Sequence, residues 1–107
     1  MKTDNATLTR LIEQCFDCSM DGRFSPAQQT DFLALGKRLR GCLVNLLSAT
    51  FQDGTPQVVA ANRAIAASNK ALNAAVQTLG KTGQVLKNLD QLIGTLDGLL
   101  KLATGFK

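Results

Sequence analysis

The sequence predicts an all-α fold, either a helical bundle or a coiled-coil oligomer, built from two shorter helices and a long heptad-patterned C-terminal helix. Its apolar residues are mainly Leu, Ala and Val, with 5 Phe and no Trp or Tyr, a composition suited to close helix packing. No segment alternates apolar and polar residues between turn residues, as strands do. With 107 residues the chain has room for one core, so we expect a single domain over residues 1–107.

The first helix is predicted over about residues 4–19, because Thr3 or Asp4 provides an N-cap and "DGRFS" ends the pattern. Its apolar residues recur at helical spacing. They are Leu8, Leu11, Ile12, Cys15 and Cys18.

The second helix is predicted over about residues 26–52. Ser25-Pro26-Ala27-Gln28 combines an N-cap serine, a proline at the first helical position and a glutamine three residues after the cap, which is the pattern of a capping box. We expect the buried side to carry Phe32, Leu35, Leu39, Cys42, Leu43, Leu46 and Leu47. We expect the solvated side to carry Asp31, Lys37, Arg38, Asn45 and Ser48.

The third helix is predicted over about residues 56–103, after the turn "QDGTP". Its main signal is an aliphatic residue at every seventh position, typical of a coiled-coil seam. This heptad seam consists of Val58, Ile65, Leu72, Leu79, Leu86, Ile93 and Leu100. Further apolar residues at Val85, Leu92 and Leu99 widen the second half of the face, as in a helix with more than one neighbour.

Gly80 and Gly83 leave two interpretations of this segment open, since each glycine costs about 1 kcal/mol in a helix interior. The uninterrupted heptad phase favours one helix, which would be about 70 Å long and would need partner chains to cover it. The alternative is a turn at Gly80–Gly83 and an antiparallel four-helix bundle that buries the seam within one chain.

The stretch "DCSMDGRFSPAQ" resembles the calcium-binding loop of an EF-hand. The resemblance, with its flanking helices, covers about a quarter of the chain and implies oxygen ligands from Asp17, Ser19, Asp21, the Arg23 carbonyl, Ser25 and Gln28. Gln28 stands where an EF-hand has a bidentate carboxylate, so any such site would be weak. We expect a capped interhelical turn and no bound metal, and keep weak calcium binding as the alternative.

Three cysteines and no histidine limit metal and redox chemistry. Cys15 and Cys18 match C-x-x-C, but a reactive pair of this kind needs a helix N-terminus, and a zinc site needs four ligands. We therefore expect buried thiols and no cofactor.

The remaining patterns predict neither an enzyme nor a nucleic-acid-binding protein. Without histidine, a nucleophile elbow or a phosphate loop, no catalytic constellation or small-molecule substrate is evident. The formal charge is +4, and the basic cluster "GKRLRG" has no Tyr or Trp nearby for base stacking, as nucleic-acid binding would favour.

We expect a protein–protein interaction or structural module, self-associating as a homo-oligomer through the heptad seam or binding another protein. The alternative is an amphipathic protein that lies on a membrane surface through its Leu-rich stretch, residues 85–106. The N-terminal residues lack the apolar core of a secretory signal, so we expect a cytoplasmic protein.

Overall fold

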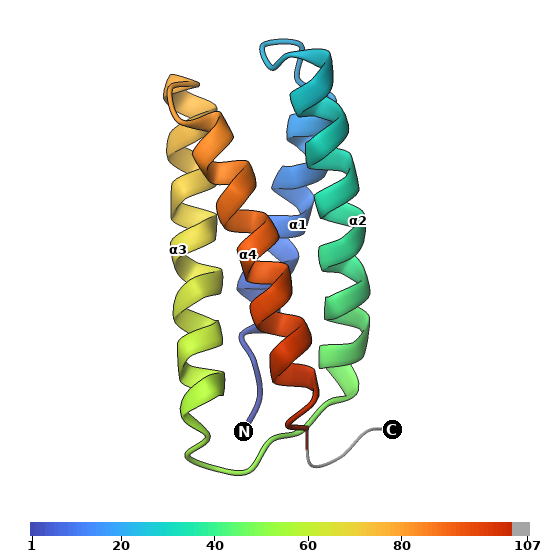
Figure 1. Ribbon diagram of the computed structural model, residues 1–107, viewed down its shortest axis with the longest axis vertical. Helices are drawn as coiled ribbons and strands as arrows, with labels where there is room; N and C mark the ends of the chain where they lie inside the picture. Colours follow the sequence, from blue (N-terminus) through green and yellow to red (C-terminus); the bar gives the residue numbers. More distant parts are fainter. Residues whose placement is uncertain (104–107) are drawn as a thin grey trace.

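The computed structural model describes residues 1–103, which form four helices arranged as a bundle (Figure 1). The helices are α1 (Asn5–Ser19), α2 (Pro26–Ser48), α3 (Pro56–Thr78) and α4 (Thr82–Leu100). Among the described residues α1 packs on α2 and α3, and α4 packs on the same two helices. The order around the bundle is therefore α1, α2, α4, α3, and the chain consists of two helical hairpins packed side by side.

Both hairpin turns lie at one end of the bundle, and the N-terminus and the α2–α3 connection lie at the other (Figure 1). Because α2 and α3 are diagonal neighbours, residues 49–55 cross the end of the bundle to join them. Phe51 is buried within this crossover, and its backbone N–H donates a hydrogen bond to the Met1 carbonyl. The crossover therefore closes the end of the core.

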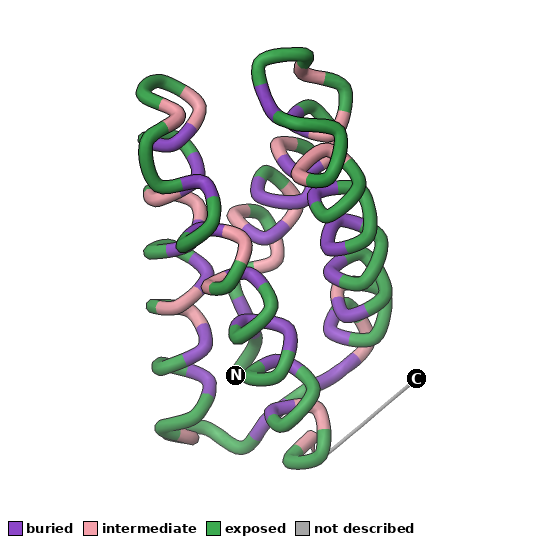
Figure 2. The backbone as a smooth tube through the Cα atoms, turned by 45° about the horizontal axis from the view of Figure 1, so that its top comes forward, coloured by how far each residue is buried: buried purple, intermediate pink, exposed green. Residues whose placement is uncertain are grey.

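A single core of aliphatic residues and Phe lies between the four helices, and Figure 2 shows the buried positions on their inward faces. Phe24 and Phe32 meet edge to face, with ring centroids 5.1 Å apart, below the α1–α2 turn. Leu39 and Leu46 of α2 are fully buried, as are Ile65 and Leu72 of α3. The predicted all-helical fold is confirmed for the described residues.

The predicted starts of the first two helices are confirmed. Asp4 caps α1 by accepting a hydrogen bond from the Thr7 backbone N–H. Ser25 and Gln28 form the predicted capping box, in which each side chain bonds the backbone N–H of the other residue. Helix α2 ends at Ser48, four residues before the predicted end, because Ala49 takes an extended conformation and begins the crossover.

The single helix predicted from 56 to 103 is wrong, because α3 ends at Thr78 and α4 begins at Thr82. The break is close to the alternative position, but its left-handed residue is Leu79, at φ 58°, and not Gly80. Leu79 donates its N–H to the Ala75 carbonyl and keeps its side chain against the core. Packing of a leucine therefore outweighs the roughly 1 kcal/mol cost of this backbone conformation.

The core face of α4 also differs from the predicted seam. Val85, Leu92 and Leu99 are buried together with Leu89 and Leu96, at alternating spacings of four and three residues. Of the predicted positions in this helix, Ile93 is buried, whereas Leu86 and Leu100 are only partly buried at the edge of the core. Helix α4 therefore turns a different face to the core than it would if the heptad pattern of α3 continued through it.

The described residues extend 42 × 21 × 19 Å, with a radius of gyration of 13.9 Å. A rod of about 70 Å does not fit these dimensions, and the radius matches a compact chain of this length. In the described part of the chain, none of the helices combines the length and the apolar character needed to cross a bilayer. Residues 104–107, which include the end of the Leu-rich stretch, lie outside the described residues.

Candidate interaction surface

The heptad seam is divided between the two helices of the second hairpin and faces the core. Val58, Ile65 and Leu72 on α3 have no exposed surface, and Ile93 on α4 is 2 % exposed. Leu79, in the turn, is partly buried with Leu86 and Leu100. Within one chain, these residues contact the other helices of the bundle, so little of the seam is free for a second molecule.

The structure places the residues of the EF-hand-like loop in a capped turn. Asp17 and Ser19 lie in the last turn of α1, whereas Asp21 belongs to the loop and receives three hydrogen bonds from the Arg23 side chain. These bonds hold the pKa of the Asp21 carboxyl below its ordinary value. Ser25 and Gln28 are engaged in the capping box, and the part of the chain that the structure describes holds no group of three or more Cys, Asp or Glu side chains placed to bind a metal ion.

All three thiols are buried, and burial raises their pKa values. The pKa is about 12 for Cys15 and about 11 for Cys18 and Cys42. Cys42 on α2 also donates a hydrogen bond to the Asp97 carboxylate on α4, at 3.5 Å, and that negative charge disfavours the thiolate further. At neutral pH these side chains are thiols, which are poor nucleophiles and poor metal ligands.

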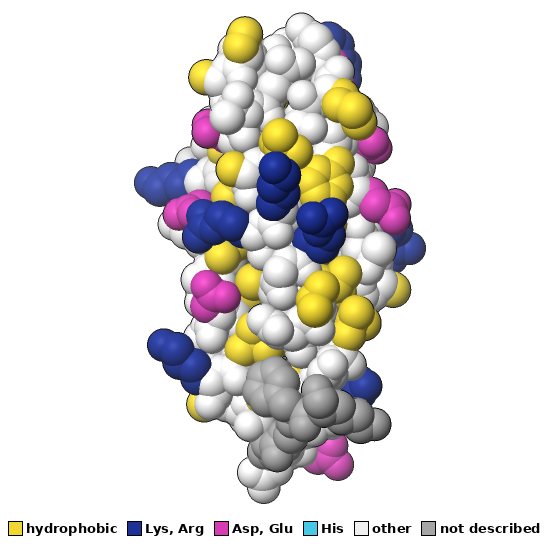
Figure 3. Space-filling view, turned by 90° about the vertical axis from the view of Figure 1, so that its right-hand side faces the viewer, with side chains coloured by type: hydrophobic (Ala, Val, Ile, Leu, Met, Phe, Trp, Pro, Cys, Tyr) yellow, Lys and Arg dark blue, Asp and Glu magenta, His cyan; other side chains and the backbone are white. Residues whose placement is uncertain are grey.

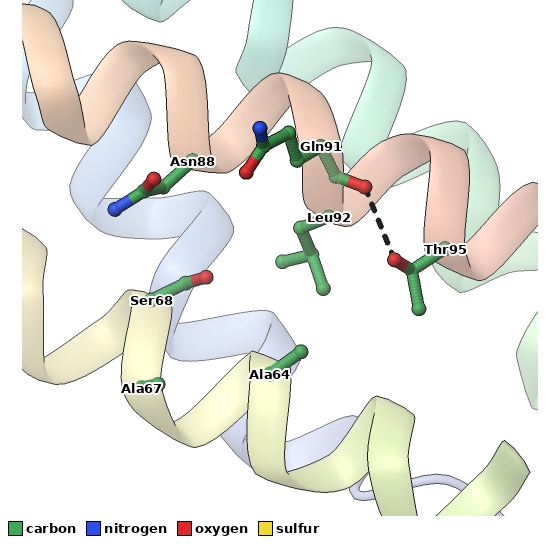
Figure 4. A pocket seen from close by; sticks show the side chains of 7 residues that line it. All are labelled: Ala64, Ala67, Ser68, Asn88, Gln91, Leu92 and Thr95. Carbon is green, nitrogen blue, oxygen red and sulfur yellow. Dashed lines mark hydrogen bonds between the residues drawn. The ribbon is translucent and has the colours of Figure 1, made fainter.

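A groove runs along the outside of α3 and α4, in two parts of about 250 Å³ and 470 Å³ that meet at Asn88. Figure 4 shows the smaller part, where Ala64 and Ala67 on α3 face Gln91 and Thr95 on α4. The Thr95 hydroxyl donates to the Gln91 carbonyl of its own helix, 3.2 Å away. Among the described residues, Lys81 is the one charged residue that lines the two parts, and the other lining side chains are small, aliphatic or uncharged polar.

A second hollow, of about 200 Å³, separates α1 from α3. Gln14 donates a hydrogen bond to Asn73 across it. The Gln14 Oε1 and Asn69 Oδ1 atoms are buried without a protein partner, a situation in which bound water commonly supplies the missing hydrogen bonds. A hollow that holds such water molecules needs no ligand to explain it.

The most distinctive surface lies on the outside of α2, and we call Leu33, Lys37, Arg40, Val44 and Leu47 the α2 face. These residues are spaced by four, three, four and three positions, so they form one stripe along the helix. Leu33, Val44 and Leu47 are 39 %, 60 % and 55 % exposed. Figure 3 views the molecule from the side of α2, with hydrophobic and basic side chains lying close together along it.

The charge of the α2 face is uniformly positive. Between Phe32 and Ser48 the helix contains three basic residues and no acidic one. Arg38 points away from the face and forms an ion pair with Asp90 on α4, at 2.9 Å. Among the described residues, Lys37 and Arg40 take part in no recorded ion pair.

Arg40 is positioned by α1. Its guanidinium carbon lies 5.7 Å from the centroid of the Phe16 ring, a cation–π geometry. The Phe16 ring in turn lies against Gly36, where an added Cβ would come within 2.9 Å of it. Gly36 therefore lets α1 and α2 approach closely. This approach places the Phe16 ring beneath Arg40, at the middle of the α2 face.

Sequence reasoning missed this surface for an identifiable reason. The helical spacing predicts Leu47 in the core, which is wrong because its side chain is exposed, and it predicts Lys37 on an ordinary solvated side. The signal in the sequence is a second heptad, out of phase with the core, in which Leu33, Arg40 and Leu47 recur at every seventh position.

Comparison with known proteins adds no identity, since no family model, curated protein or solved structure matches the chain.

Proposed function

We propose that this chain is a non-enzymatic protein–protein interaction module that binds its partner through the α2 face. The observation that carries the proposal is the row of exposed aliphatic side chains Leu33, Val44 and Leu47, which do not belong to the hydrophobic core that the described residues form. Scattered exposed leucines are common on protein surfaces, but an ordered row along one helix is typical of an interface.

The form of the surface favours a helical or helix-lined partner. Side chains at alternating spacings of three and four present a continuous ridge, which fits between the side chains of a second helix. Arg40 and the half-buried Phe16 ring lie near the middle of this ridge. Arginine and aromatic side chains are enriched where interfaces are most strongly bound.

Self-association through the heptad seam is a second candidate, favoured by the regular recurrence of Leu72, Leu79, Leu86 and Ile93 across the turn. Two chains would exchange their intramolecular contacts for intermolecular ones as α3 and α4 straighten into one helix. This exchange would expose and rebury most of the core, and the turn at Leu79 would have to open. The α2 face requires no such rearrangement.

A membrane surface is the alternative from another class, because the α2 face is both basic and apolar. Two basic residues near an anionic surface contribute about 2 kcal/mol, or roughly a 30-fold preference. Three aliphatic side chains add a limited apolar area, whereas helices that lie in membranes usually bury a broad face with several aromatic residues. Protein binding is therefore the better match to this surface.

Site-specific photocrosslinking tests the proposal. A photoreactive amino acid replaces Val44 in the full chain, and the matched control replaces Val59, which lies on α3 and is also exposed. We expect, in cells that make the protein, a defined protein adduct from position 44 that is absent from position 59 and is lost on Leu47→Asp. Equal adducts from the two positions, or crosslinks from position 44 to lipid alone, would contradict the proposal.

A further inference from the structure

We propose that the partner of the α2 face is an acidic amphipathic helix of another protein, and not a second copy of this chain; this inference rests on the interaction function proposed above. The face combines three exposed aliphatic side chains with two cations that no acidic side chain of the described residues neutralises. The complementary surface has apolar side chains opposite the aliphatic residues and carboxylates opposite Lys37 and Arg40.

Symmetry argues against a second copy. In an antiparallel two-fold pairing of α2 faces, Leu33 meets Leu47 of the other copy and Arg40, midway between them, meets Arg40 of the other copy. In a parallel pairing, Lys37 and Arg40 each meet their own equivalents. Either arrangement places like charges opposite each other at the centre of the interface, which disfavours self-recognition.

The position of Arg40 makes it well suited to a carboxylate. Its guanidinium carbon lies over the Phe16 ring, 5.7 Å from the centroid, and this contact limits the conformational freedom of the side chain before a partner arrives. A planar guanidinium can bind a carboxylate through two parallel hydrogen bonds. Phe16 thus acts as a support that positions Arg40.

The spacing of the face sets the length of the partner. Leu33 and Leu47 lie 14 positions apart, which corresponds to about 21 Å along a helix. The partner therefore needs about four helical turns, with apolar residues near both ends and Asp or Glu near the middle. A shorter or unstructured acidic peptide would reach only part of the ridge.

The test uses two synthetic helical peptides of four heptads, which share a leucine stripe and carry either Glu or Lys at the flanking positions. Each is titrated into the isotopically labelled full chain, and backbone amide signals are followed by NMR. We expect the Glu peptide to shift signals of residues 33–47 and of Phe16 saturably, with a Kd that rises as salt is added. We expect the Lys peptide to bind at least tenfold more weakly.

Charge reversal provides the matched variants. K37E combined with R40E should weaken binding of the Glu peptide by about tenfold or more and favour the Lys peptide. K70E, which makes the same kind of change at an exposed position of α3, should leave both affinities unchanged. Thermal unfolding of each variant checks that the bundle is intact, and R40K keeps the charge if R40E fails to fold.

The outcomes separate this inference from the function on which it rests. If both peptides bind residues 33–47 equally and Leu47→Asp abolishes the binding, the interaction function stands and the acidic preference is wrong. If neither peptide binds but the protein forms dimers that Val44→Asp dissociates, the face binds its own copy and the inference is again wrong. If anionic vesicles shift the same signals while the Glu peptide does not, both proposals fail.

Discussion

At the scale of single residues, two glycines of α2 illustrate how local packing decides what a position tolerates. Gly36 is buried against Phe16, and an added Cβ would lie 2.9 Å from the ring and 3.2 Å from the Cys15 Cβ. Gly41 is exposed, and an added Cβ would meet nothing within 4 Å. Both glycines lower the intrinsic stability of the helix by a similar amount, but only Gly36 makes room for a neighbouring side chain.

Alanine substitutions should therefore have opposite effects. Gly41→Ala should raise the free energy of unfolding by about 1 kcal/mol, since alanine is the better helix former. Gly36→Ala gains the same helix preference but forces Phe16 and α1 outward, so a net loss of about 1 kcal/mol is expected. Urea denaturation of the two variants measures both values, and equal stabilisation would contradict the close packing of Phe16 on Gly36.

The thiols provide a second prediction at this scale. Because burial holds the pKa values of Cys15, Cys18 and Cys42 at about 11 to 12, few thiolates are present at pH 8. Labelling with a thiol reagent should be slow in the native protein and become fast in denaturant. Rapid labelling of the native chain, or zinc retained through purification, would show that at least one thiol is accessible.

The acid sensitivity of folding should depend in part on two carboxyls, those of the exposed Asp4 and the half-buried Asp21. Hydrogen bonds from Thr7 lower the pKa of Asp4, and hydrogen bonds from Arg23 lower that of Asp21. A carboxyl whose pKa is lower in the folded state stabilises the fold above its unfolded value, and this stabilisation is lost as the pH falls through the folded value. The free energy of unfolding should therefore be level above about pH 5 and decrease below about pH 4.

Asp4→Asn separates the cap from the charge. Asparagine caps helices about as well as aspartate but does not titrate. Stability at neutral pH should be nearly unchanged, and the decrease below about pH 4 should become shallower than in the original chain. If the free energy of unfolding decreases below about pH 4 as steeply in the variant as in the original chain, Asp4 does not contribute to the acid sensitivity.

At the scale of elements, the α1–α2 loop is stabilised by its own side chains. Ser25→Ala removes one half of the capping box and should cost about 1 kcal/mol. Because Asp21 is paired with Arg23 and the Ser25 and Gln28 side chains are engaged in the capping box, millimolar calcium should leave the thermal midpoint unchanged. A calcium-dependent rise in the midpoint that Asp17→Ala abolishes would restore the EF-hand interpretation.

The same scale explains which elements could be predicted from sequence. The starts of α1 and α2 depend on local chemistry, the capping residues Asp4 and Ser25, and such signals can be recognised without knowledge of tertiary contacts. Gly80 and Gly83 make a turn between α3 and α4 possible, but the segment contains no proline and its left-handed residue is Leu79, so these glycines do not decide between a turn and a continuous helix. Only the packing of α4 on α2 and α3 determines that the chain turns there.

The candidate surface was harder to predict than the fold. In sequence, Val44 and Leu47 are apolar residues of an amphipathic helix and resemble their buried neighbour Leu46. Helix α2 carries two neighbouring heptad patterns, one buried and one on the α2 face. The directions from which α1 and α4 approach the helix decide which of the two is buried. Phe16 and Gly36 fix that approach, and their pairing across two helices has no signature in the sequence.

At the scale of the whole molecule, the bundle is closed within one chain. Both hairpins bury their apolar faces against each other, and the crossover at residues 49–55 covers the end of the core. Such a molecule has no need of a second copy for stability. Its exposed aliphatic residues on α2 are then free for a partner, which is the condition for the proposed function.

The most direct test of this claim is the molar mass and radius of gyration of the intact protein, measured by light scattering and small-angle X-ray scattering over a range of concentrations. A closed monomer should have a mass of 11.4 kDa and a radius of gyration close to 13.9 Å at every concentration. Leu72→Asp, which places a charge in the core, should unfold the monomer. A mass that rises to that of a dimer, with an elongated particle that Leu72→Asp dissociates, would contradict it and favour association through the heptad seam.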